Sequence, residues 1–120
     1  MKCCCFINNT NEDKDDEENL IIPNIIYGFV SRIISLNKIL ISYNTNNKDY
    51  NYYIELNNVK IIPGRNELNE FVLGKFILHK KVSITNIKLL DYNDIIGDVY
   101  IGNICVNKWL VENGYANYKN

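Results

Sequence analysis

The residues best suited to chemistry lie near the end of the chain, where three aspartates fall close together. Asp91, Asp94 and Asp98 carry carboxylate oxygens, which hard cations such as Ca²⁺ prefer as ligands. The pattern around them predicts a turn followed by a strand, and a strand directs successive side chains to opposite faces. We therefore expect the three carboxylates to be scattered, and the sequence predicts no metal site.

Other reactive side chains lack partners at a useful spacing. His79 is the only histidine, and the adjacent lysines indicate an exposed helix end. No Ser or Cys partner is evident, and no Gly-rich phosphate loop is present. The sequence thus indicates no small-molecule substrate.

A cysteine triplet stands close to the N-terminus at Cys3, Cys4 and Cys5. A metal site is disfavoured there because the spacer of two to four residues that usually separates ligands is missing. Two interpretations remain open. One is S-acylation, since stable anchoring takes two lipid signals, and the other is an unmodified tail.

Composition indicates a short tail and one domain. Among 120 residues, positions 1–19 hold six acidic and two basic side chains, whereas the remainder holds eight acidic and eleven basic ones, a net charge of +3. We expect a disordered Cys-rich and acidic tail over residues 1–24 and one domain over 25–120. Its mild basicity tolerates phosphate but is far from that of a basic DNA-binding protein.

Targeting signals are not evident. The charged run 12–18 interrupts any signal peptide, and the apolar stretch 20–26 is too short to span a membrane and contains Pro23. We expect an intracellular, non-secreted protein, which would be membrane-associated if the cysteines are acylated.

Alternating apolar residues predict strands over 27–34, 39–43, 50–56 and 82–90, with a fifth strand after a turn at 91–94. A polar loop is expected over 44–49. Residues 66–80 predict a helix whose buried stripe comprises Leu68, Phe71, Val72 and Phe76.

The last third of the chain predicts a strand, a turn at Gly102, a second strand and a short helix. Asn107 is expected to cap that helix. Val106 and Val111 then have the spacing of a hydrophobic staple, and Gly114 provides a left-handed stop.

This stretch resembles the C-terminal signature of staphylococcal nuclease-like (thermonuclease) domains. The matching positions are Val106, Asn107, Leu110, Val111, Gly114 and Ala116. The resemblance implies an α+β fold, a five-stranded OB-fold-like β-barrel with two packed helices. The family's final helix is expected to be absent, because the sequence ends at Asn120.

Active members of the family imply calcium-dependent hydrolysis of DNA or RNA, using metal-binding carboxylates, phosphate-binding arginines and a glutamate base. The corresponding positions have changed. Asn37 and Lys60 stand where the family has metal-binding aspartates, and Glu55 and Asp94 where it has arginines. Pro63 occupies the position of the base and has no titratable group.

The resemblance therefore implies a catalytically degenerate domain that acts as a binding module for a protein or single-stranded nucleic acid. No cofactor is expected. Ca²⁺ would enter only under the alternative, a calcium-dependent nuclease with a remodelled site. We expect an ion pair between Glu55 and Lys60. The candidates for nucleic-acid binding are Lys80, Lys81, Tyr92, Tyr115 and Tyr118.

If the tail is acylated, replacing Cys3, Cys4 and Cys5 together by serine removes the lipid attachment points. We expect the triple variant to move from the membrane to the soluble fraction on cell fractionation. Equal partitioning of the variant and the wild type would contradict a membrane tether.

Overall fold

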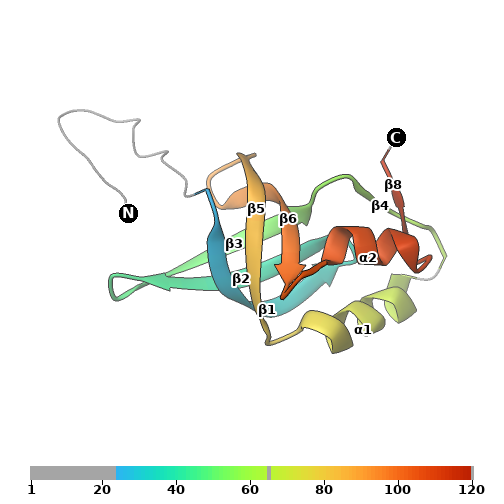
Figure 1. Cartoon of the computed structure of the whole chain (residues 1–120), viewed down its shortest axis with the longest axis horizontal. Coiled ribbons are helices and arrows are strands. Elements are labelled where there is room, and N and C mark those ends of the chain that lie inside the picture. The colour runs from blue at the N-terminus through green and yellow to red at the C-terminus, as the bar shows by residue number, and fades with distance from the viewer. Residues whose placement is uncertain (1–23, 65, 120) are drawn as a thin grey trace.

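Alternating apolar side chains build a closed β-barrel of five strands (Figure 1). The computed structural model describes residues 24–64 and 66–119, so the cysteine triplet lies outside the described residues. The barrel strands are β1 (Ile26–Ser35), β2 (Lys38–Thr45), β3 (Lys48–Leu56), β5 (Lys81–Leu89) and β6 (Asp94–Ile101).

The strand order closes the barrel. Strands β3, β2, β1, β5 and β6 are paired antiparallel in that order. A parallel pairing of β3 with β6 joins the ends, from Tyr53 opposite Asp94 to Leu56 opposite Gly97. This arrangement is consistent with an OB-fold barrel, so the α+β fold expected from the sequence is confirmed.

Two helices and three short strands complete the fold. The helices are α1 (Asn66–Ile77) and α2 (Val106–Glu112), and the short strands are β4 (Val59–Ile61), β7 (Ile104–Cys105) and β8 (Ala116–Tyr118). Strand β7 pairs with β6, and β4 pairs with β8 in a separate two-stranded sheet. Figure 1 shows both helices on one side of the barrel. No helix in the described ranges is long and apolar enough to cross a membrane.

The core fills the barrel with branched aliphatic side chains. Val30, Ile41, Ile54, Ile84 and Ile95 come from five different strands and are all fully buried. Each alternates with an outward neighbour, as the period of two requires. The core therefore fixes which side chains the barrel presents to solvent.

The expected buried stripe of α1 was wrong in part: Phe76 is partly buried against the core, but the fully buried positions are displaced by one residue. Its buried positions are Asn69, Leu73 and Ile77, whereas Leu68 is 51% and Phe71 62% exposed. Both stripes have helical spacing. Leu73 and Ile77 are fully buried in the core, and Asn69 joins the same stripe, where its Nδ2 donates to the carbonyl of Tyr115 at 3.2 Å.

Helix α1 also ends three residues earlier than expected. Leu78 still donates to the Gly74 carbonyl at 2.9 Å, but His79 has a φ of 64°. A left-handed residue cannot continue a right-handed helix. His79 instead donates its backbone N–H to Val30 at 2.7 Å, which leads the chain into β5.

Asn107 lies within the first turn of α2 and does not cap it, so that prediction was wrong. The helix begins at Val106, and Cys105 occupies the cap position without a side-chain hydrogen bond. The buried Asn107 amide instead bonds to backbone groups of β6 and of the β3–β4 turn. Its Oδ1 accepts from Val99 N–H at 2.9 Å, and its Nδ2 donates to the carbonyls of Asn57 and Gly97 at 3.0 and 3.2 Å.

The left-handed stop after α2 is confirmed. Gly114 has a φ of 82°. Its N–H donates to the Val111 carbonyl at 3.1 Å, and that of Tyr115 donates to Leu110 at 2.9 Å. These two bonds satisfy carbonyls at the helix end.

The polar loop expected over 44–49 is shorter than predicted. The β2–β3 hairpin continues to a tight turn at Asn46 and Asn47, whose φ values are 52° and 63°. Asparagine tolerates the left-handed backbone that such hairpin turns require. In the hairpin, burial and the nearby rings of Tyr43 and Tyr50 raise the pKa of Tyr52 above its usual value.

Replacing Asn107 by alanine leaves buried backbone groups on β6 and in the β3–β4 turn without their partner. We expect a loss of about 3 kcal/mol in the free energy of unfolding, since each unsatisfied buried group costs roughly 1–3 kcal/mol. Urea denaturation measures it. Asn113→Ala on the same helix is the control, because that exposed side chain bonds only to Trp109. Equal small losses in both variants would show that the buried amide is dispensable.

Candidate ligand-binding face

The end of the barrel near the β1–β2 turn holds several of the positions that the resemblance assigns to catalysis. Asn37 lies in this turn, and its backbone carbonyl accepts from Leu56 N–H at 2.8 Å. Its side-chain Oδ1 accepts from the Ser35 hydroxyl at 2.9 Å, and its Nδ2 donates to the Val59 carbonyl at 3.4 Å. The Asn37 side chain thus holds the β1–β2 turn in place through hydrogen bonds to Ser35 and to Val59.

Lys38 stands between the two acids that occupy arginine positions. It lies opposite Glu55 in the β2–β3 register, and its Nζ is 4.0 Å from Asp94 Oδ1. The same ammonium lies 5.6 Å from the centroid of the Tyr53 ring, a cation–π distance. A lysine beside this carboxylate disfavours a bound cation.

The expected Glu55–Lys60 ion pair is not formed. Glu55 Oε2 instead lies 2.9 Å from Lys119 Nζ. Lys60 is exposed in β4 and faces Asn117 of β8, and Pro63 is exposed beyond the end of β4. The two acids of the site are therefore each neutralised by a lysine from another strand or from the C-terminal segment.

Across the described residues, no group of three or more His, Cys, Asp or Glu side chains is placed to hold a metal ion. The arginine and carboxylate sets needed for phosphodiester hydrolysis are likewise not assembled at these positions. What the site can offer a ligand is hydrogen bonding and weak charge.

The five residues expected to bind nucleic acid do not form one surface. Lys80 and Lys81 precede and begin β5, whereas Tyr92 follows the end of the same nine-residue strand and is 83% exposed. Tyr115 packs on Trp109, with ring centroids 5.4 Å apart. Tyr118 lies on β8 and is 45% exposed.

An aromatic pair on β1 was missed by the sequence analysis. Tyr27 and Phe29 point outward and are each 55% exposed. In the strand register, Phe29 lies between Lys81 of β5 and Ser42 of β2. The sequence signal for them is their alternation with three buried neighbours, which indicates that both rings face outward. That Phe29 lies opposite Lys81 follows only from the alignment of β1 with β5.

This outward surface continues across the next two strands. Arg32 of β1 lies opposite Leu40 of β2, and Leu40 lies opposite Tyr53 of β3. We call the outward surface of these three strands the β1–β3 face; its members, with the adjoining lysine of β5, are Tyr27, Phe29, Arg32, Lys38, Leu40, Tyr53 and Lys81. It combines exposed aromatic rings with basic side chains, and it also carries Glu55 opposite Lys38.

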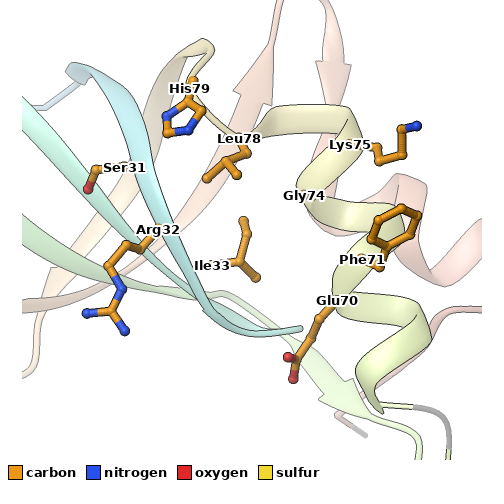
Figure 2. Close-up of a pocket in the computed structure, with 9 residues that line it drawn as sticks. All are labelled: Ser31, Arg32, Ile33, Glu70, Phe71, Gly74, Lys75, Leu78 and His79. Carbon is orange, nitrogen blue, oxygen red and sulfur yellow. The ribbon is translucent and has the colours of Figure 1, made fainter.

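A groove of about 560 Å³ adjoins this face between β1 and α1 (Figure 2). Ile33 and Leu78 form apolar walls, and Gly74 leaves space because it has no side chain. In Figure 2, Arg32 extends away from α1, whereas Lys75 and Phe71 project from the helix. The groove thus lies on the α1 side of β1, beside the β1–β3 face.

Sequence comparisons with known protein families and with curated proteins give no match for this chain.

The ion pair between Glu55 and Lys119 is exposed, so it should contribute little to stability. Glu55→Gln is expected to change the free energy of unfolding by less than about 0.5 kcal/mol. Trp109→Ala removes a ring whose centroid lies 4.5 Å from that of Phe76. This variant should lose about 3 kcal/mol in the free energy of unfolding. Urea denaturation compares them; a loss near 2 kcal/mol for Glu55→Gln would show that this acid serves the fold.

Proposed function

We propose that this barrel is a degenerate thermonuclease-like domain that binds single-stranded nucleic acid without cleaving it. The C-terminal signature and the OB-fold arrangement support the relationship. The charge reversals at Glu55 and Asp94, with lysines nearby, support the loss of hydrolysis, because removing one such electrostatic group typically costs about 10²–10³ in rate.

The pairing of Phe29 with Lys81 carries the choice of ligand. Single-stranded nucleic acids stack their bases on exposed aromatic rings while basic side chains follow the phosphates. Phe29 is 55% exposed and lies beside Lys81 in the β1–β5 register. Tyr27 and Tyr53 supply further stacking surfaces on the same face, and Arg32 supplies a further cation.

The ligand is expected to be recognised without strong sequence preference. Stacking accepts any of the bases because every base has a π-face, and phosphate contacts carry no sequence information. A protein ligand, by contrast, would show no competition by oligonucleotides and a weaker dependence on salt.

Fluorescence anisotropy of a labelled 15-nucleotide oligothymidine tests the proposal on the full chain at about 50 mM salt, with Ca²⁺ or with EDTA. Phe29→Ala should weaken binding about tenfold, since stacking contributes roughly 1–3 kcal/mol per base. Lys81→Ala should lower the slope of log K against log salt by about 0.7. Leu68→Ala is the control, because that apolar side chain is also exposed but lies on α1 outside the groove.

Absence of binding at low salt would contradict a nucleic-acid ligand and leave protein binding as the function of this face. Intact oligonucleotide in both buffers is the expected result. Cleavage in Ca²⁺ that EDTA abolishes and that survives stringent purification would establish the alternative, a calcium-dependent nuclease.

A further inference from the structure

Gly74 is a glycine in the interior of α1 that the fold does not require. A Cβ at Gly28 or at Gly97 would lie 2.5 Å from an atom of a neighbouring strand, so close packing excludes a side chain at both. At Gly74 the backbone is helical, and a Cβ would meet Ile33 Cγ1 at 3.8 Å, an ordinary contact. Alanine would fit there and would favour the helix, because glycine is the poorer helix former. The packing of the chain itself thus gives no reason for the missing side chain.

The space above Gly74 belongs to the groove between β1 and α1, and an exposed ring stands one turn away. Phe71 lines the same groove and is 62% exposed, with the Lys75 ammonium 5.6 Å from the centroid of its ring. Figure 2 shows Gly74 between Phe71 and Leu78 along α1. These three positions are spaced by three and four residues, which is the spacing of the seam between two packed helices. Helix α1 therefore presents a projecting ring and an empty hole on one face.

A ring and a hole on the same helix suit a second copy of that helix running in the opposite direction. In a pair related by a two-fold axis, every contact between two different residues occurs twice. If the axis passes midway between residues 71 and 74, Phe71 of each copy lies level with Gly74 of the other. A parallel pair would instead set ring against ring and leave the two glycines facing each other. Only the antiparallel pair fills both holes.

The charges on this side of α1 agree with the antiparallel direction. Glu67 lies in the first turn of the helix and Lys75 in the last. Antiparallel packing brings the first turn of each helix beside the last turn of the other, so carboxylate and ammonium face each other. Arg32 and Glu70, which also line the groove, are of opposite sign, and the exposed Lys80 beyond the helix end adds one positive charge. Two copies of this face therefore meet with little net repulsion.

We propose that the protein forms a two-fold symmetric dimer through α1, in which Phe71 of each copy occupies the space above Gly74 of the other. Burial of the two exposed rings supplies the driving force, and the glycines let the two helix backbones approach closely. The contact involves one helix face, so the dimer is weak, as interfaces below about 1,200 Å² are. The dimer does not depend on nucleic-acid binding, because the groove lies on the α1 side of β1.

Sedimentation equilibrium of the full chain, from about 10 µM to about 1 mM, covers the range of a weak dimer. A reducing agent is present throughout, so that the cysteines do not crosslink two copies. We expect a reversible shift from monomer to dimer as the concentration rises. Phe71→Ala should weaken dimerisation about tenfold, because it removes the ring that is buried at the centre of the interface. Tyr92→Ala is the matched control, because that ring is 83% exposed but lies between β5 and β6.

Gly74→Ala separates a role in the dimer from a role in the fold. The methyl group occupies the hole, so dimerisation should weaken about fivefold. The melting temperature of the dilute monomer should rise by roughly 3 °C, because alanine favours the helix. A lower melting temperature would show that the glycine serves the fold and would overturn the argument from the empty hole.

A charge exchange tests the direction of the two helices. Glu67→Lys and Lys75→Glu should each weaken dimerisation about threefold, and the variant that carries both changes should regain the wild-type association. Failure of the double variant to regain it would overturn the antiparallel arrangement. A chain that stays monomeric up to the highest concentration, or a dimer that Phe71→Ala leaves unchanged, would overturn the proposal as a whole.

Discussion

A single buried amide holds the closure of the barrel in place. Asn107 joins α2 to β6 and to the turn after β3, so one side chain connects the three segments that meet where the sheet closes. Gly97, whose carbonyl accepts from Asn107, also lets β6 lie close to β5, because a Cβ there would lie 2.5 Å from Ile84 Cγ2. The parallel pairing of β3 with β6 in turn sets Glu55 and Asp94 on adjacent strands. The geometry of the candidate site thus depends on a polar contact in the core.

Local features of this fold could be read from the sequence, and relations between elements were harder to read. Strand alternation identified the five barrel strands, and Gly114 marked the end of α2. The stripe of α1 could not be chosen from spacing, since residues 68, 72 and 76 and residues 69, 73 and 77 both fit a helix. Packing against distant segments decides it, through the full burial of Leu73 and Ile77 and the contact of Asn69 with Tyr115, 46 positions away. For the same reason the sequence favours Asn107 as a helix cap, whereas its hydrogen-bond partners lie on other segments.

In the candidate site, too, local features could be read from the sequence, whereas contacts between distant residues could not. Resemblance located Asn37, Glu55 and Asp94 at positions where the family places chemistry, but the charge pairs at these positions were unpredictable. Lys119 is 64 residues from Glu55 along the chain, and an ion pair of that separation leaves no local pattern. The sequence does not single out the aromatic surface at Tyr27 and Phe29. Outward aromatic residues on a strand indicate a binding surface only when a cation lies beside them, and here that cation, Lys81, comes from another strand.

We propose that Glu55 and Asp94, each paired with a lysine, have replaced the phosphate-binding arginines of a nuclease cleft, and that Asn37 and Lys60 have replaced its metal-binding aspartates. Isothermal titration calorimetry of Ca²⁺ into the full chain tests this most directly. The account predicts heats no larger than dilution up to about 1 mM Ca²⁺, a concentration that covers the weaker protein sites. Binding at one equivalent that Asp94→Asn abolishes would contradict it.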